Sequence, residues 1–220
     1  MLRVGLTGDL GSGKSTVAKM LAERGAVVLS SDEMARAMMQ PGEAVYREIV
    51  ERFGPGVVAA DGSLDRRELA RLAFDAEKPR VEELNAIVHP AVIGAQAELI
   101  GELAKTKPDA IVVVESALVF SAQQGSEPWR GRFDCVVVVT APEEMKVARF
   151  VERVAAGKEL SAGERAALEA DARKRLAVQH EAPVAGECFV VENDDGVEEL
   201  EEQVVRLMLR LRAMAAERRD

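Results

Sequence analysis

The sequence predicts an α/β fold in three layers, with a parallel β-sheet between two layers of helices. Apolar runs of strand length recur along the chain, and segments whose apolar residues have helical spacing separate them. A glycine-rich loop joins the first of these runs to the first helical segment. Strands that alternate with helices run in the same direction, so their sheet is expected to be parallel.

The start of the chain supplies two strands and the helix between them. Residues 2–7 form an apolar run, and residues 16–24 show helical spacing that ends before Gly25. Residues 27–29 are the second predicted buried strand, which we expect to lie beside the first. The carboxyl ends of such parallel strands are where ligands gather.

A helical insertion over residues 33–107 is predicted between the second and third strands. Its segments with helical spacing are residues 43–53, 66–74, 79–87 and 91–103. Turns rich in glycine, proline and aspartate interrupt the pattern early in the insertion. The whole chain is otherwise expected to form a single domain over residues 1–220.

The second half of the chain returns to the sheet. The predicted strands are residues 110–114, 135–139 and 189–191, and the predicted helices are residues 145–154 and 197–218. Ser161 and Glu164 have the spacing of a capping box, which predicts that another helix begins there. Residues 146–182, which include a glycine-flanked segment, are predicted to act as a mobile lid.

The glycine-rich loop matches a phosphate-binding pattern. Residues 8–15 read Gly-Asp-Leu-Gly-Ser-Gly-Lys-Ser and fit G-x-x-x-x-G-K-[ST] between a predicted strand and helix. Lys14 would reach the β- and γ-phosphates of a nucleotide, and the Ser15 hydroxyl would bind Mg²⁺. Asp9 is expected to point outward, because the middle positions of the pattern vary. The predicted nucleotide-binding residues of this loop are Gly8, Gly11, Ser12, Gly13, Lys14, Ser15 and Thr16.

Two carboxylates follow predicted strands. Asp32 could act as the general base that orients an acceptor hydroxyl and could help to position Mg²⁺. It would suit the first turn of a helix capped by Ser30 equally well. Glu115 ends the third predicted strand, where it could hold Mg²⁺ directly or through water; the alternative is a surface glutamate that closes a strand.

Two arginines and a histidine complete the candidate residues. Arg149 and Arg153 lie one helical turn apart, so that a closing lid could bring both to the charge that develops on a transferred phosphoryl group. The alternative is a solvated helix face. His89 precedes Pro90, and a lone histidine is more often structural than a ligand.

The composition limits the possible partners. The net charge of −9 argues against general nucleic-acid binding, and 48% hydrophobic with 30% charged residues is typical of a soluble globular protein. Cys135 and Cys188 lie in apolar runs and are expected to be reduced core thiols. No apolar run approaches the ~20 residues of a membrane helix, and a strand begins almost at once, which leaves no room for a signal peptide. We therefore expect a cytoplasmic protein, monomeric or weakly homo-oligomeric, that binds no membrane.

Several segments together resemble the dephospho-coenzyme A kinase family over most of the chain. The similar segments are residues 5–18, 28–36, 61–67, 88–90 and 114–120, which include the glycine loop, Asp32, the Val-His-Pro motif and Glu115. The resemblance implies ATP-dependent phosphorylation of the ribose 3′-hydroxyl of dephospho-coenzyme A, with Mg²⁺ as cofactor. It implies Asp32 as the base, Lys14, Arg149 and Arg153 as further catalytic residues, Asn193 on the adenine side, and Arg66, His89 and Glu115 as substrate-binding residues.

The chain departs from the family pattern around the substrate and the lid. Ser30, Ala117 and Ser121 stand where the family usually has an acidic residue, a proline and a glutamate, and the stretch after Gln179 lacks Lys and Arg. Two alternatives follow: a small-molecule kinase of the same fold with another hydroxyl acceptor, and a nucleotide-binding relative without catalysis. The combination of Lys14, Ser15 and Asp32 argues against the second, because a mere binder has no need of a base.

Overall fold

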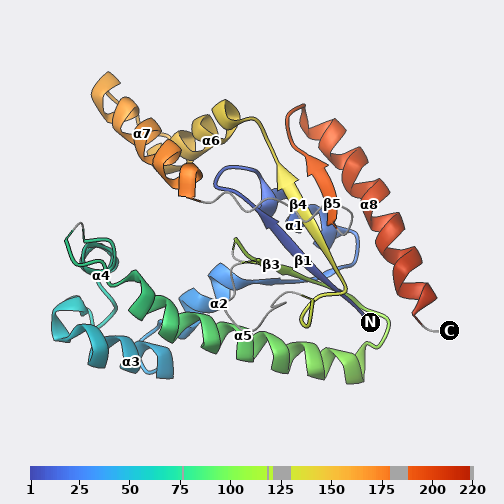
Figure 1. Cartoon of the computed structure of the whole chain (residues 1–220), viewed down its shortest axis with the longest axis horizontal. Coiled ribbons are helices and arrows are strands. Elements are labelled where there is room, and N and C mark those ends of the chain that lie inside the picture. Colours follow the sequence, from blue (N-terminus) through green and yellow to red (C-terminus); the bar gives the residue numbers. More distant parts are fainter. Residues whose placement is uncertain (76, 118, 121–129, 179–187, 219–220) are drawn as a thin grey trace. The chain divides into compact units, whose positions relative to one another are not determined.

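The computed structural model describes residues 1–75, 77–117, 119–120, 130–178 and 188–218 (Figure 1). Strands and helices alternate along the chain, as the sequence predicts. The elements are β1 (Leu2–Gly8), α1 (Lys14–Glu23), β2 (Val27–Ser30), α2 (Ser31–Met38), α3 (Ala44–Phe53), η1 (Pro55–Val57), α4 (Arg66–Ala73), α5 (Val81–Thr106), β3 (Ile111–Glu115), β4 (Cys135–Thr140), α6 (Glu143–Ala155), α7 (Ala162–Val178), β5 (Cys188–Glu192) and α8 (Val197–Glu217).

The five strands form one sheet in the order β2-β3-β1-β4-β5, and the paired registers given for β1, β3, β4 and β5 are all parallel. This confirms the predicted α/β class. The expectation that the second strand lies beside the first is wrong, because β3 lies between them. All five residues of β3 are buried, which suits an inner position, whereas β2 is only partly buried at the edge.

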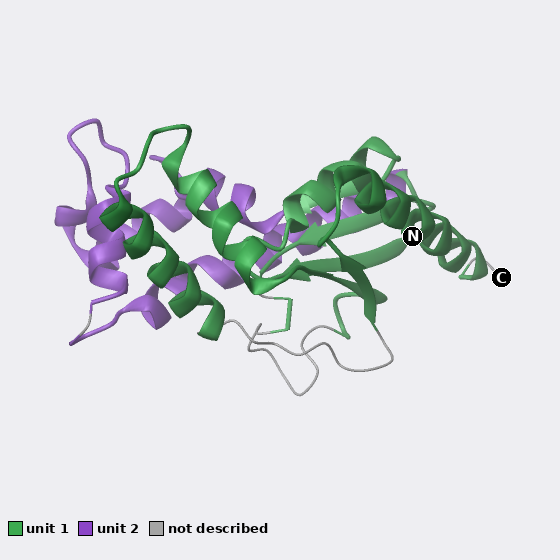
Figure 2. Ribbon diagram, turned by 90° about the horizontal axis from the view of Figure 1, so that it is seen from above, with its two compact units in different colours: residues 1–29, 107–220 green, residues 30–106 purple. Residues whose placement is uncertain are grey.

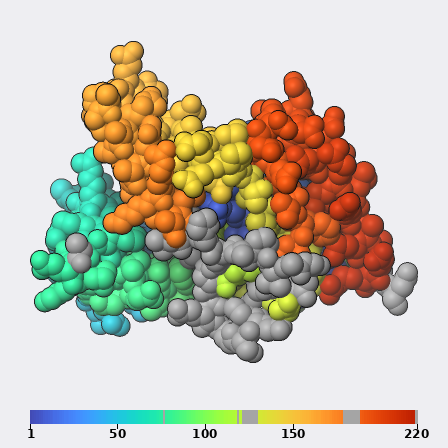
Figure 3. Space-filling model, turned by 45° about the horizontal axis from the view of Figure 1, so that its top comes forward, coloured from blue at the N-terminus to red at the C-terminus, as the bar shows by residue number. Residues whose placement is uncertain are grey.

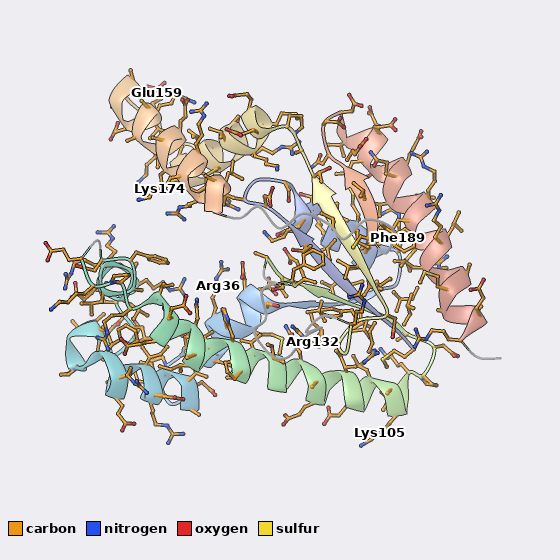
Figure 4. All side chains as sticks on the ribbon, viewed as in Figure 1. Arg36, Lys105, Arg132, Glu159, Lys174 and Phe189 are labelled. Carbon is orange, nitrogen blue, oxygen red and sulfur yellow. The ribbon has the colours of Figure 1, made fainter. Side chains whose placement is uncertain are left out.

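Helices α1 and α8 cover one face of the sheet. Their apolar side chains share one core cluster with inward-facing residues of β1, β3 and β4, among them Leu6, Val113 and Val137. Phe189 of β5 packs against this cluster and lies beside α8 (Figure 4). Within the described part of the chain, every helix is too short or too polar to span a lipid bilayer.

The described chain separates into two compact units, residues 1–29 with 107–220, and residues 30–106 (Figure 2). The second unit holds α2 to α5 around its own core, in which Ile49, Val57 and Ile87 are buried. Helix α2 begins after Ser30, whose side chain accepts a hydrogen bond from the Glu33 amide at 3.4 Å, as the capping pattern predicts.

Helix α5 is longer than the sequence suggests. Residues 79–87 and 91–103 are expected as separate segments, but a single helix, Val81–Thr106, runs through Pro90. Proline inside a helix removes one backbone hydrogen bond. Val88 and Ala91, which flank it, pack with Ile87 against the core of the second unit. This packing stabilises the helical conformation where local propensity would break it.

Asp134 anchors the start of β4. Its carboxylate accepts hydrogen bonds from the Arg3 amide at 2.7 Å and the Arg3 guanidinium at 2.8 Å, and Arg218 lies 3.1 Å away. Burial by itself would raise the pKa of Asp134, but the hydrogen bonds from Arg3 outweigh it, and the pKa lies below its usual value. The carboxylate thus ties β1 and the end of α8 to β4.

We expect Asp134→Asn to lower the free energy of unfolding by about 2 kcal/mol at neutral pH, because it removes charge-assisted hydrogen bonds. A lowered folded-state pKa stabilises the fold above the unfolded-state pKa, and this contribution is lost as the pH falls through the folded-state value. Urea unfolding near pH 7 measures the loss of stability in the variant. Near pH 3 the difference in unfolding free energy between the variant and the wild type should be smaller. Glu202→Gln, which breaks the exposed Arg206–Glu202 pair, is the control and should change stability little. Equal stability of the Asp134 variant and the wild type would contradict this role.

Candidate functional site

The glycine-rich loop connects β1 directly to α1. Gly13 is the N-cap residue of α1, with φ at 94°, and Gly11 has φ at 74°; both are left-handed conformations that favour glycine. Side chains at these positions would also collide with neighbours: a Cβ at Gly11 would meet the backbone of Lys146, and one at Gly13 would meet the amide of Asn193. The loop is therefore shaped by two later segments, α6 and the end of β5, as well as by its own glycines.

Ser15 in the first turn of α1 contacts Glu115, the last residue of β3. The Ser15 hydroxyl donates a hydrogen bond of 2.5 Å to the Glu115 carboxylate, which is 9% exposed. A hydroxyl beside a carboxylate is a set of hard oxygen donors that fits Mg²⁺. The described residues contain no group of three or more His, Cys, Asp or Glu side chains placed to hold a metal ion. Mg²⁺ usually binds one or two protein carboxylates and takes its other ligands from water and substrate phosphates, so a site with few protein ligands suits it.

Arg149 and Asn193 contact each other and the backbone of the glycine loop. One Arg149 nitrogen donates to the Asn193 backbone oxygen at 3.1 Å and to its side-chain oxygen at 3.2 Å, and the other reaches the Gly11 carbonyl at 3.5 Å. The Asn193 amide donates to the Ser12 carbonyl at 2.8 Å. These contacts fix the backbone of the loop from α6 and from the loop before α8.

Arg153 has a different setting from Arg149. It is exposed, and its guanidinium lies over the ring of Phe150 on the same helix, 5.8 Å from the centroid. Among the described residues no hydrogen bond joins Arg153 to the glycine loop, so the structure brings only one of the two arginines to it.

The remaining loop residues have distinct environments. Lys14 is partly buried in the first turn of α1, and Thr16 is exposed there. The Ser12 side chain is fully buried, and its hydroxyl has no hydrogen-bond partner in the described structure. Gly8 ends β1. The first amides of α1 have no partner within the helix and give the loop its capacity to bind an anion.

Asp9 is the clearest error among the predictions for the loop. It was expected to point outward because its position in the pattern varies, but its carboxylate accepts a hydrogen bond of 2.7 Å from the Lys146 ammonium group of α6. The pattern carries no information about a partner more than 130 residues away along the chain. Sequence reasoning missed Lys146 altogether; the available signal was its place one helical turn before Arg149.

Three of the predicted site residues, Asp32, Arg66 and His89, belong to the second unit, and their surroundings within that unit are as follows. Asp32 is exposed in the first turn of α2, where Ser30 rather than Asp32 supplies the capping hydrogen bond. Arg66 is exposed at the start of α4. His89 is partly buried within α5, and burial lowers its pKa, with a smaller opposing effect from Glu82.

Some departures from the family pattern have a place in the structure. Ser30 is the N-cap of α2, so the hydroxyl there has a structural use.

Ser161 and Glu164 form the predicted capping box at the start of α7, with hydrogen bonds in both directions. Ser121 and residues 179–187, which include the end of the predicted lid, lie outside the described residues.

A separate pocket of about 460 Å³ lies along β5. It is lined by the edge strand β5 and by the first half of α8, whose residues are coloured orange to red in Figure 3. It contains none of the predicted site residues. The chemistry suggested by the sequence therefore centres on the glycine loop and not on this pocket.

Comparison with known proteins points to one family. A family model described as dephospho-CoA kinase matches residues 2–199. A dephospho-CoA kinase of Streptomyces avermitilis is 40% identical over 204 residues, which cover 93% of this chain and 91% of that protein. One of Moorella thermoacetica is 44% identical over 153 residues, covering 70% and 69%. The crystal structure of TT1252 from Thermus thermophilus aligns over 95% of this chain and 96% of its own, with a TM-score of 0.64 and 33% identity.

Proposed function

This chain belongs to the dephospho-CoA kinase family, and from that premise we propose that it transfers the γ-phosphoryl group of ATP to the ribose 3′-hydroxyl of dephospho-CoA. The match over residues 2–199 carries the proposal, since it includes the glycine loop and the whole second unit. The product of this reaction is coenzyme A.

The glycine loop binds the phosphates in this proposal. The first amides of α1 point their partial positive charge at the polyphosphate, and Lys14 in the same turn supplies a full charge to the phosphoryl group in transit. Gly8, Gly11, Ser12, Gly13 and Thr16 complete the loop. Mg²⁺ would neutralise phosphate charge; the Ser15 hydroxyl and the Glu115 carboxylate, which already meet at 2.5 Å, are the residues that would hold it, with Asp32 as a further proposed ligand.

The second unit supplies the acceptor side. Asp32 orients the ribose hydroxyl and accepts its proton, which an exposed carboxylate not used as a helix cap is free to do. Arg66 and His89 bind the acceptor together with Glu115, which belongs to the first unit, and residues 33–107 are the proposed substrate-binding insertion. Burial lowers the pKa of His89, so this imidazole is neutral at pH 7 and recognises the substrate through hydrogen bonds.

Residues 146–182 act as the lid in this proposal, and its end lies outside the described residues. Arg149 and Arg153 stabilise the charge that develops during transfer. Asn193 lies on the adenine side of the loop and holds the Ser12 carbonyl. A cytoplasmic location, a monomeric or weakly homo-oligomeric state and the absence of nucleic-acid partners remain predictions from the composition.

The two arginines should respond differently to substitution. The Arg153 side chain makes no hydrogen bond to the glycine loop among the described residues. Arg153→Ala should therefore lower kcat with little change in the KM for ATP. Arg149→Ala should lower kcat and also raise that KM, because Arg149 already holds Gly11 and Asn193. Steady-state kinetics with ATP as the varied substrate separates the two patterns. An Arg153 variant changed only in the KM for ATP would make Arg153 a ground-state binder instead.

Acceptor specificity tests the proposed function. Purified protein, ATP and Mg²⁺ are incubated with dephospho-CoA, adenosine, pantetheine or a simple alcohol in turn, and ADP formation is followed. We expect a kcat/KM for dephospho-CoA at least about a hundredfold above the others, since remote parts of a substrate contribute binding energy to the transition state. A higher kcat/KM with another acceptor would support the alternative kinase.

A further inference from the structure

We propose that Asp9 and Lys146 form a positioning pair. The pair holds the glycine loop (residues 8–15) against α6, and it neutralises the negative charge that Asp9 would otherwise present to ATP. The inference deepens the proposed function and rests on one part of it, the binding of a polyphosphate by the glycine loop. Neither residue is expected to touch the reacting atoms.

The pair is short and sheltered. The Lys146 ammonium lies 2.7 Å from the Asp9 carboxylate, and the two side chains are 13% and 26% exposed. The Lys19–Glu23 pair on α1, by contrast, spans 3.9 Å, with side chains 79% and 57% exposed. Exposed ion pairs of that kind contribute little to the stability of a protein, because water and salt screen the attraction between their charges. The Asp9–Lys146 pair is screened less, so its charges matter to their surroundings.

Three successive loop residues contact the body of α6 and α7. Asp9 pairs with Lys146, and Leu10 packs against the cluster that contains Val147 and Phe150 of α6. Gly11 lies so close to the backbone of Lys146 that no side chain fits between them. The first turns of α6 therefore pack against the glycine loop, and Lys146, in the first turn, contacts both Asp9 and Gly11.

Charge explains why the pair forms at this position. Asp9 is the second residue of the phosphate loop, and its carboxylate would repel the several negative charges of bound ATP. The ammonium group of Lys146 neutralises it within a hydrogen bond. The side chain of Lys146 leaves α6 one turn before Arg149, so the same contact also steadies the segment that places Arg149 against Gly11.

Substitution of Lys146 alone should weaken ATP binding more than substitution of both Asp9 and Lys146. Lys146→Met leaves the Asp9 charge uncompensated near the phosphates, and we expect the Kd for ATP to rise about tenfold, within the range of couplings between residues in contact. Asp9→Asn combined with Lys146→Met removes both charges and should return the Kd to within about threefold of the wild type. The KM for dephospho-CoA should stay nearly constant in both.

The test measures the Kd for ATP of the wild type, the Lys146 variant and the double variant by titration calorimetry with Mg²⁺ on the full chain. Lys19→Met, which removes the same charge from an exposed position on α1, is the matched control and should bind ATP as the wild type does. Thermal unfolding checks each variant, and Lys146→Gln with its own Asp9→Asn double variant replaces the methionine series if that variant is unstable.

Two results would overturn the inference. If the single Lys146 variant and the double variant weakened ATP binding equally, Lys146 would act through packing and not through the charge of Asp9. If neither changed the Kd, the pair would have no part in nucleotide binding. Because binding is measured without an acceptor, these results are separable from a failure of the proposed function, in which ATP binds but no coenzyme A forms.

Discussion

Lys14→Ala should reduce kcat by at least about a thousandfold while the protein stays folded. Removal of a single group that stabilises transition-state charge typically costs ~10²–10³-fold in an enzyme site, and an arginine that stabilises a phosphoryl group in transfer contributes ~10³–10⁵-fold. Lys14 occupies the first turn of α1, directly after the N-cap Gly13, and no other lysine lies within residues 8–15. We therefore expect the loss of kcat to lie at the upper limit of the first range and within the second.

Rapid-quench measurement of phosphoryl transfer at saturating ATP is the appropriate assay for Lys14→Ala, because it separates the chemical step from binding. Lys19→Ala serves as the control, since it lies on the same helix with an exposed side chain. A folded Lys14 variant with near wild-type transfer would remove the glycine loop from the mechanism.

Asp32→Asn should reduce kcat by about 10²–10⁴-fold, the usual contribution of a general base. A loose transition state depends less on deprotonation of the acceptor, which favours the lower part of this range. Binding of ATP and of dephospho-CoA should persist, because asparagine has nearly the same shape. The stability should hardly change, since Asp32 is exposed and Ser30 supplies the cap of α2.

The Asp32 variant separates the two interpretations that spacing left open. In the first, Asp32 is only a favourable residue in the first turn of a helix, and the variant would keep its kcat. In the second, Asp32 is the base, and single-turnover transfer would be slow with both substrates bound. An unchanged kcat would assign the base to another residue, with Glu115 the next candidate.

Local patterns predict much of the first unit. The residues of β1, the glycine loop and α1 follow one another in the chain, so their pattern determines both the conformation and the place of Lys14 and Ser15. Apolar runs likewise predict β3 and β4, because the side chains of buried strands are almost all apolar. Glu115 is proposed for the same Mg²⁺ as Ser15 because it ends a strand of the parallel sheet, and the two side chains share a hydrogen bond.

Contacts between distant segments account for what the sequence missed. The order of β3 and β1 depends on which strand is buried on both sides, and the Asp9–Lys146 pair depends on where α6 lies against the loop. Helix α5 runs through Pro90 because the core of the second unit stabilises it. In each case tertiary packing decides between conformations that the local pattern leaves open.

The most direct test of the central claim is the identification of the reaction product. The full-length protein is incubated with Mg²⁺, dephospho-CoA and ATP labelled in the γ-phosphoryl group, and the product is analysed by mass spectrometry and ³¹P NMR. We expect coenzyme A that carries the label on its ribose 3′-oxygen, with one ADP formed for each product molecule. Consumption of ATP without any labelled coenzyme A, or a label on another hydroxyl, would contradict the account.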